Sequence, residues 1–240
     1  MRKEEPVVYV VFPTANPIKA VNAIKNWVRM GYSVFSYCDN KETLNDFGIR
    51  LVADNLICCH LEGVEYKGYW WACNKLINKL FSHGSSDIVV LAADDMDPDP
   101  NKTAQEIGRE YFERFPDGEG IMQPCGDTGG EMMDGKYAAE RICGSPWFGY
   151  GWFKAGRFNG KATPEEFFHF YGDEVIKEVA EREGLLWMRK DLCQKHHHWS
   201  FYQNVERTKY QERNSREHWQ HDKDLFFKLK ELGFPEEYEA

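Results

Sequence analysis

The sequence predicts an α/β fold in which a mostly parallel sheet is sandwiched between helices. Up to residue 124, short apolar runs alternate with segments of helical periodicity in the order βαβαβαβ, which favours right-handed crossovers between parallel strands. The run at 88–92 is continuously apolar, as is typical of a strand covered on both faces. The second half of the chain is more polar, and we expect it to form an elaborated, largely helical C-terminal part.

The first βα unit has the clearest local signals. A β-rich run at 7–12 precedes Asn16 and Pro17, which combine a helix N-cap with a proline at the first helical position. The helix should end at Gly31, and its apolar face consists of Ile18, Val21, Ile24 and Val28. The next strand is predicted at 33–38.

The following stretch is less regular. A short polar segment at 39–47 leads to a weak strand, for which 49–52 and 56–60 are alternatives. A helix is predicted at 66–80 because its apolar residues recur at helical spacing. Three further elements complete the predicted sheet region: a strand at 88–92, a helix at 103–115 and a strand at 120–124.

From residue 126 onward the pattern loosens. We expect a loop at 126–136, a pair of strands at 141–154, and a short helix that begins with a capping box at 163–166. Later elements are a helix at 173–183 that ends at Gly184, a strand at 185–188 and a helix at 215–232. Residues 1–199 are therefore assigned to the sheet domain, and 200–240 to a helical extension packed on it.

The overall charge limits the classes of partner. The chain has 30 Lys and Arg against 39 Asp and Glu, a formal net charge of -9, so general attraction to nucleic acid or an anionic membrane is not expected. No apolar run approaches the roughly 20 residues that span a bilayer, and the N-terminus lacks the pattern of a signal peptide. Seven cysteines without a C-x-x-C pair predict reduced thiols. These features predict a cytoplasmic protein without membrane contact.

Polar residues follow three of the predicted strands. They are Pro13 and Thr14, then Asp39 and Asn40, then Asp94, Asp95 and Asp97. Because ligands of open parallel sheets bind outside the carboxyl ends of the strands, we expect these residues to line one site. The chain has no G-x-G-x-x-G after its first strand, and the sequence GRFNGKA lacks the spacing and the hydroxyl residue of a P-loop. Dinucleotide and P-loop sites are therefore excluded.

The aspartate run suggests a cation site. Asp94, Asp95 and Asp97 would repel one another at a strand end, and a divalent metal that bridges them to a diphosphate would relieve the repulsion. His196 and His198 are candidate further ligands because alternate residues of an extended segment point the same way. An imidazole ligand favours Mn²⁺ over Mg²⁺. The alternatives are a solvated acidic turn and a histidine-rich surface turn.

The order of these motifs resembles that of the metal-dependent glycosyltransferases of the GT-A fold. The resemblance rests on a first strand that ends in Pro-Thr, a second that ends in Asp39, the segment VVLAADDMDP, the GDE at 172–174 that opens a late helix, and a later histidine. It covers roughly residues 6–199. One departure is Ala92, which stands where many members have the first aspartate of the metal motif.

The resemblance implies a GT-A-like fold and a nucleotide-sugar donor, with a UDP-sugar as the expected form. In that family the aspartates after the fourth strand hold Mn²⁺ or Mg²⁺ against the donor diphosphate, and the aspartate after the second strand contacts the base. Carried onto this sequence, these roles imply a nucleotide-sugar site of Pro13, Thr14, Asp39, Asn40, Asp94 and Asp95. They also imply a metal site of Asp95, Asp97, His196 and His198.

The same resemblance implies a catalytic base. The late aspartate of inverting members takes the proton of the acceptor hydroxyl, which implies this role for Asp173, with Glu174 as the second candidate. The alternative is that Asp173 is only the N-cap of its helix, since aspartate is among the best caps.

The acceptor is the least defined part. The segments GSPWFGYGWF, HFYGDEV and HHHWS are similar to parts of glycosyltransferase-like proteins of tailed phages. This resemblance implies a hydroxymethylated DNA base as the acceptor, which would be extruded from its duplex to be reached. It also implies that the protein acts in the host cytoplasm. Residues 200–230 interleave cationic and aromatic side chains, which suits a nucleic-acid backbone or, alternatively, an amphipathic closing helix. Trp147, Tyr150 and Trp152 would stack equally well on a sugar, so glycan, lipid-linked and protein acceptors are the alternatives.

Two other classes of protein would use the same features. A nucleotidyl or phosphoryl transferase also uses paired aspartates, but it needs a nucleoside triphosphate. A noncatalytic binding protein that has kept the fold would bind the nucleotide without turnover.

Overall fold

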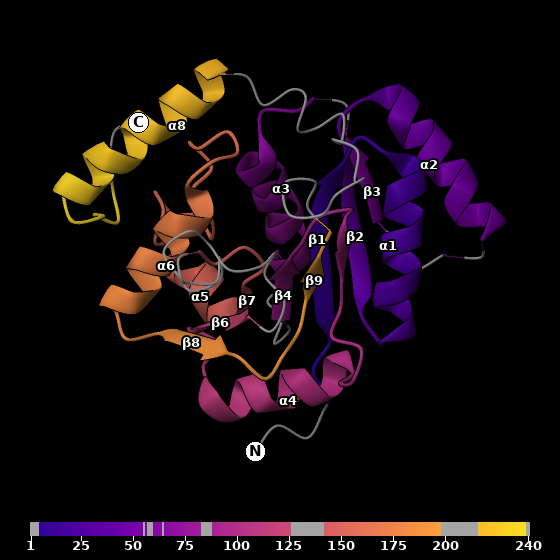
Figure 1. Ribbon diagram of the computed structural model, residues 1–240, viewed down its shortest axis with the longest axis horizontal. Helices are drawn as coiled ribbons and strands as arrows, with labels where there is room; N and C mark the ends of the chain where they lie inside the picture. Colours follow the sequence, from indigo (N-terminus) through magenta and orange to yellow (C-terminus); the bar gives the residue numbers. More distant parts are fainter. Residues whose placement is uncertain are drawn as a thin grey trace.

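The computed structural model describes residues 5–54, 56, 60–63, 65–82, 88–125, 142–197 and 216–238 (Figure 1). The strands of its main sheet are β1 (Val8–Thr14), β2 (Ser33–Cys38), β3 (His60–Gly63), β4 (Ile88–Leu91), β6 (Ile121–Pro124), β7 (Trp147–Gly149) and β8 (Leu186–Arg189). A second, small sheet consists of β5 (Met96–Asp97) and β9 (Lys195–His196). The helices are α1 (Pro17–Arg29), α2 (Lys41–Ala53), α3 (Tyr69–Phe81), α4 (Ala104–Arg114), α5 (Tyr150–Ala155), α6 (Gly172–Arg182) and α8 (Arg216–Glu231).

The main sheet has the strand order β3-β2-β1-β4-β7-β6-β8. Its strands pair in parallel except for β7, which is antiparallel to both β4 and β6. Helices cover both faces of this sheet (Figure 1). The predicted α/β class with a mostly parallel, sandwiched sheet is therefore confirmed.

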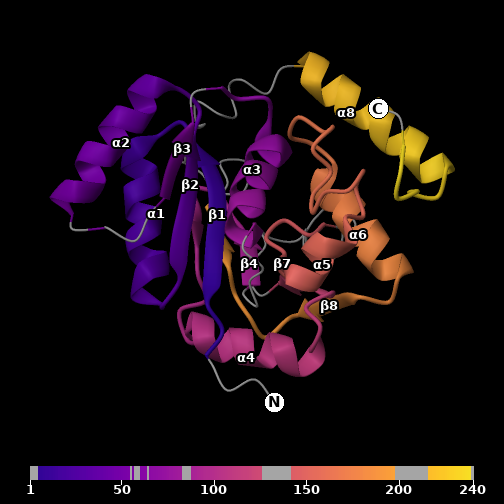
Figure 2. The same cartoon turned by 180° about the vertical axis from the view of Figure 1, so that it is seen from behind.

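Each face of the sheet has its own hydrophobic core. Side chains alternate between the faces along a strand, so Val10 of β1 and Val90 of β4 point to one side, and Val11 and Leu91 point to the other. The first side is packed by α1, α2 and α4, and the second by α3, α5, α6 and α8. Figure 2 shows α1 and α2 on one side of the strands and α3, α5, α6 and α8 on the other, with α4 below the strands. Burial on both sides accounts for the continuous apolar run of β4.

Local capping signals position two of the helices that were predicted. The Asn16 side chain accepts a hydrogen bond from the Lys19 backbone N–H at 3.1 Å and begins α1. Thr103 and Glu106 form a reciprocal capping box at the start of α4. The expected starts of both helices are confirmed.

The segment after β2 differs from the prediction. Residues 41–53 form helix α2, so the polar segment at 39–47 and the alternative strand at 49–52 are both wrong. The Asn40 side chain caps this helix by accepting from the Thr43 backbone N–H at 2.8 Å. Phe47 and Leu51 are buried at helical spacing, whereas Ile49 is 71% exposed, so only the helical period places the apolar residues inward.

Two predictions in the second half are also wrong. The expected strand pair at 141–154 is the single strand β7 followed at once by α5. Residues 163–166 form a turn rather than a helix, because the Thr163 hydroxyl donates to the Trp70 carbonyl at 3.3 Å instead of capping. Glu166, three positions after Thr163, accepts from the Asn159 side-chain amide at 2.9 Å and from the Tyr238 hydroxyl at 3.0 Å instead of reaching back to the Thr163 N–H. Tertiary hydrogen bonds have replaced the local capping box here.

Helix α8 packs on the side of the sheet that α3 and α6 cover. Leu225, Phe226 and Leu229 are buried in the same core as α3 and α6. The expected boundary at 199–200 lies outside the described residues. Among the residues that the structure describes, no helix combines the length and the apolarity that crossing a membrane requires. The cysteines described, including buried Cys38, Cys73 and Cys143, are free thiols.

Trp27 links the α1 side of the core to the aspartate segment. Its fully buried indole N–H donates to the Met96 carbonyl at 2.9 Å. We expect Trp27→Phe to lower the free energy of unfolding by about 2–4 kcal/mol, since packing and this hydrogen bond are both lost. Urea denaturation measures the change. Ile49→Ala, on the exposed face of α2, is the control and should change stability by less than about 0.5 kcal/mol; an equal loss in both variants would contradict this account.

Candidate active site

The carboxyl ends of β1, β2 and β4 bring the predicted polar residues to one edge of the sheet. In the register, Thr14 pairs with Cys38, so Asp39 lies one residue beyond the end of β1. Val11 pairs with Leu91, which brings Asp94 level with Thr14. The Thr14 hydroxyl donates to Asp94 Oδ2 at 2.7 Å. The strand-end placement that the sequence predicted therefore produces a direct contact between residues 80 positions apart.

Asp39 and Asn40 form the β2 side of this edge. Asp39 is buried and accepts a hydrogen bond from the Asn40 side-chain amide at 2.8 Å, while Asn40 also caps α2. Pro13 is buried within β1 beside Tyr37. Asp39 and Asn40 are thus held rigidly by a strand end and a helix start.

Asp94 is in an environment that disfavours a lone negative charge. Burial and the adjacent charge of Asp95 raise its pKa to about 7, against the opposing effects of the Thr14 hydrogen bond, Lys19 and His196. A carboxyl group with this pKa is half protonated near neutral pH. The edge of the sheet is therefore short of positive charge beside Asp94 and Asp95.

A late segment of the chain supplies a histidine to this edge. Strand β9 runs antiparallel to β5, with Met96 opposite His196 and the His197 backbone N–H donating to the Asp95 carbonyl at 2.8 Å. The His196 Nε2 atom lies 3.2 Å from Asp95 Oδ1. The Asp95 side chain is only 8% exposed, so a solvated turn does not describe Asp95, whereas the Asp97 side chain is 36% exposed. His198 lies outside the described residues.

Asp97 is directed to other partners. Its Oδ1 accepts from the Asn26 side chain at 2.8 Å, and its Oδ2 lies 2.9 Å from His197 Nε2. Both oxygens of Asp97 therefore have partners other than Asp95 and His196, and the role of Asp97 as a metal ligand stays a prediction. His197 and Asn26 were missed by the sequence analysis, since nothing local indicates which histidine of the triplet faces which aspartate.

The donor set at Asp95 fits a divalent cation. A carboxylate oxygen and an imidazole nitrogen in contact are ligands that Mn²⁺ accepts, and the crowded, buried Asp94 beside them adds the need for positive charge. Within the described ranges, no three His, Cys, Asp or Glu side chains are arranged as a complete metal site. The protein would then provide two ligands, and the oxygens of a bound diphosphate would provide others.

Asp173 lies on the first turn of α6. The N-cap of α6 is Tyr171, so Asp173 is not the cap. Its Oδ1 accepts from the Glu174 backbone N–H at 3.1 Å, and its carbonyl accepts from the Cys143 backbone N–H at 3.1 Å. Burial raises the pKa of Asp173 to about 6, and its backbone hydrogen bonds and nearby His196 lower it.

His196 connects the two groups of carboxylates. It acts electrostatically on Asp94 at the end of β4 and on Asp173 at the start of α6. Tyr69 of α3 also lies here, because its hydroxyl donates to the Ala92 carbonyl at 2.9 Å. Burial, Cys73 and, to a smaller extent, Asp173 raise the pKa of Tyr69. Tyr69 was missed because its position in an apolar helix face indicated only the core. The structure therefore brings the predicted donor residues, the two predicted metal ligands Asp95 and His196, and the predicted base to one region.

The expected acceptor aromatics are placed differently. Trp147 and Trp152 are fully buried, with their indole N–H groups bonded to Gln194 and to the Ala162 carbonyl. Neither ring has a free face for a sugar, so the expectation for these two residues is corrected. Tyr150 is partly exposed and packs against Phe81.

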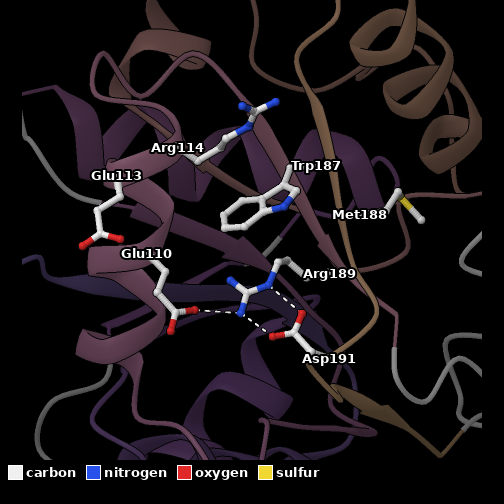
Figure 3. Close-up of a pocket in the computed structure, with 7 residues that line it drawn as sticks. All are labelled: Glu110, Glu113, Arg114, Trp187, Met188, Arg189 and Asp191. Carbon is white, nitrogen blue, oxygen red and sulfur yellow. Dashed lines mark hydrogen bonds and ion pairs between the residues drawn. The ribbon is translucent and has the colours of Figure 1, made fainter.

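A pocket of about 580 Å³ lies elsewhere, between α4 and β8 (Figure 3). It is lined by Glu110, Glu113, Arg114, Trp187, Met188, Arg189 and Asp191. The Arg189 guanidinium forms ion pairs with Glu110 and Asp191 at 2.7 and 2.6 Å and lies over the Trp187 ring. Its charge is thus satisfied within the protein, and none of the predicted site residues lines this pocket.

Comparisons with known proteins bear on the fold. No protein-family model and no curated protein matches this chain. Among solved structures, GalNAc-T7 with UDP, GalNAc and Mn²⁺ is similar with a TM-score of 0.56 and 11% identity, over 95% of this chain and 52% of that one. S. aureus TarS 1–349 in complex with UDP is similar with a TM-score of 0.51 and 11% identity, over 78% of this chain and 59% of that one.

The longer S. aureus TarS chain is similar with the same TM-score of 0.51 at 12% identity, and this chain spans 36% of it. The chain thus corresponds to only part of each of these proteins. At such low identity the likeness concerns the fold, and these neighbours are glycosyltransferases of the GT-A type. The described chain has a GT-A fold, with its predicted site at the edge of the sheet where the parallel strands end.

Proposed function

We propose that this protein is a glycosyltransferase that transfers a sugar from a UDP-sugar to an acceptor hydroxyl with inversion, aided by a divalent cation. The proposal is carried by one observation: on a GT-A fold, the strand ends bring Thr14 to Asp94 at 2.7 Å and His196 to Asp95 at 3.2 Å, and His196 is close enough to Asp173 on α6 to lower the pKa of that carboxyl group. A donor site and a base close to each other are what a single displacement needs.

The donor side follows from the strand ends. Pro13, Thr14, Asp39 and Asn40 would face the uridine and ribose, with Asp94 close to the ribose and diphosphate. Asp95 and His196 would hold Mn²⁺ or Mg²⁺, which when bound stabilises the negative charge of the departing diphosphate. UDP in two of the neighbouring structures, with Mn²⁺ in one of them, supports this choice of donor and cation.

Asp173 is the proposed base. The acceptor oxygen forms a bond to the anomeric carbon, the bond from that carbon to the diphosphate oxygen breaks, and the acceptor proton passes to the Asp173 carboxylate. A pKa of about 6 leaves this carboxylate largely ionised at pH 7, yet makes it a better proton acceptor than an ordinary aspartate. Glu174, the next residue of α6, is the second candidate.

The acceptor is proposed from charge. In helix α8 the four Lys and Arg are balanced by four Asp and Glu, and the whole chain is negative. This balance favours the hydroxyl of a glycan over a hydroxymethylated base in DNA, which is the alternative acceptor. Residues 200–215 of the basic, aromatic stretch lie outside the described part.

An acceptor panel tests the function. With Mn²⁺ and a set of nucleotide sugars, we expect sugar transfer to a glycan acceptor and none to plain DNA, measured with radiolabelled donor. Transfer only to hydroxymethylated DNA would assign the DNA acceptor instead. Turnover of nucleoside triphosphates without turnover of any nucleotide sugar would contradict the proposal and favour a nucleotidyl or phosphoryl transferase.

UDP binding tests the cation. Titration calorimetry should show UDP binding at least about tenfold tighter with Mn²⁺ than without it, a difference of about 1.4 kcal/mol. Asp95→Ala should abolish this difference. Asp46→Asn, an exposed carboxylate on α2, is the control and should keep it. Equal UDP affinity with and without Mn²⁺ in the unmodified protein would contradict the metal role.

The pH dependence and one substitution test the base. Because protonated Asp173 cannot accept a proton, kcat/KM should increase about tenfold per pH unit below pH 6 and level off above it. Asp173→Asn should reduce kcat by about 100-fold or more and keep UDP binding. Glu181→Gln, exposed on the same helix, should behave as the unmodified protein. An unchanged kcat in Asp173→Asn would remove this role.

A further inference from the structure

Helix α8 carries a fully buried carboxylate that is bound by backbone amides of another segment. Asp222 Oδ1 accepts from the Phe168 N–H at 2.9 Å, and Oδ2 accepts from the N–H groups of His169 and Phe170 at 2.9 and 2.8 Å. His221 Nδ1 also lies 3.0 Å from Oδ1. Three successive amides of residues 168–170 therefore share one acceptor that is about fifty positions away in the sequence.

These hydrogen bonds solve a problem that the segment cannot solve locally. Residues 163–171 are bends and turns without helix or strand hydrogen bonds, so their buried N–H groups need another acceptor. A buried carboxylate in turn needs several donors to offset the loss of hydration. The two requirements are met together, which makes this contact specific to the backbone path of residues 168–170.

The path continues directly to Asp173. Tyr171 has a left-handed backbone with φ of 62°, and its ring stacks on Phe226 of α8 at 5.1 Å. At Gly172 a Cβ atom would lie 2.2 Å from Trp70 Cε2, so α3 leaves no space for the chain to shift. The segment is fixed between α8 on one side and α3 on the other, and it delivers Asp173 into the first turn of α6.

We propose that Asp222 is a positioning residue for Asp173, which sets the base at the donor site by holding the backbone of residues 168–170. Asp222 itself lies on α8 and bonds only to this segment and to His221 among the described contacts. The C-terminal helix is then part of the catalytic arrangement. This inference rests on the proposed function of Asp173.

The role is separable from docking of the helix. Leu225, Phe226 and Leu229 bury the apolar face of α8 in the main core, and Lys230 pairs with Glu178 of α6. The helix therefore keeps its main contacts when the Asp222 carboxylate is replaced by an amide, whereas the three N–H groups lose part of their acceptor. The residues proposed to bind the donor lie at the ends of β1 and β2, and none of the Asp222 hydrogen bonds described above reaches them.

Asp222→Asn tests the inference, with Asp224→Asn as the matched control because Asp224 is exposed two residues away on the same helix. We expect Asp222→Asn to lower kcat by about 10- to 100-fold while the KM for the donor and the affinity for UDP with Mn²⁺ stay within about twofold. Asp224→Asn should keep the kcat, the KM for the donor and the UDP affinity of the unmodified protein. Phe226→Leu, which removes the ring under Tyr171, should lower kcat in the same selective way if Asp222→Asn does not fold.

Equal losses of kcat and UDP affinity, or an unchanged kcat in folded Asp222→Asn, would overturn the inference. Hydrogen exchange separates it from the proposed function. If the unmodified protein transfers no sugar, the proposed function fails. The inference is then tested by the hydrogen-exchange rates of the backbone amides of residues 168–170 and 174. Faster exchange at all four amides in Asp222→Asn, but not in Asp224→Asn, would show that Asp222 holds the segment and Asp173; unchanged exchange at residue 174 would overturn it.

Discussion

Buried backbone N–H groups outside helices and strands need acceptors, and two aspartates supply them for the segments that lead to the site. Asp99 is 2% exposed and accepts from the N–H groups of Asn101, Lys102 and Cys193, which holds the chain just before β9 and His196. Asp222 does the same for residues 168–170, just before Asp173. Without such acceptors these irregular segments would lose several hydrogen bonds on burial, so the placement of His196 and Asp173 depends on them.

Electrostatics and topology reinforce each other at the edge of the sheet. Parallel pairing of β1 with β4 brings Thr14 to Asp94, and the antiparallel pairing of β5 with β9 brings His196 to Asp95. Burial and the adjacent charge of Asp95 raise the pKa of Asp94, and this is the edge where the proposed cation and diphosphate would bind. The fold thus concentrates three carboxyl groups and two histidines at one edge of the sheet.

Several elements were predictable because their causes are local. The caps at Asn16 and Thr103, the buried run of β4 and the polar residues after β1, β2 and β4 follow from neighbouring residues and from the rule that parallel strands end together. The failures also have causes. Helix α2 was missed because its short apolar run resembles a strand. The short helix expected to begin with a capping box at 163–166 is absent because tertiary partners bind the capping residues Thr163 and Glu166.

The sequence by itself therefore determined the α/β class, most of the strands, and the set of residues at the strand ends, since these depend on period, capping and chain order. Only the tertiary structure decided which histidine faces which aspartate, that Asp97 pairs with His197 and Asn26, and that Trp147 and Trp152 are core residues. It also revealed that the Asp222 carboxylate binds the backbone N–H groups of residues 168–170. These features depend on the register between segments about 50 to 100 residues apart, and a shift of one residue in such a register turns every side chain to the opposite face.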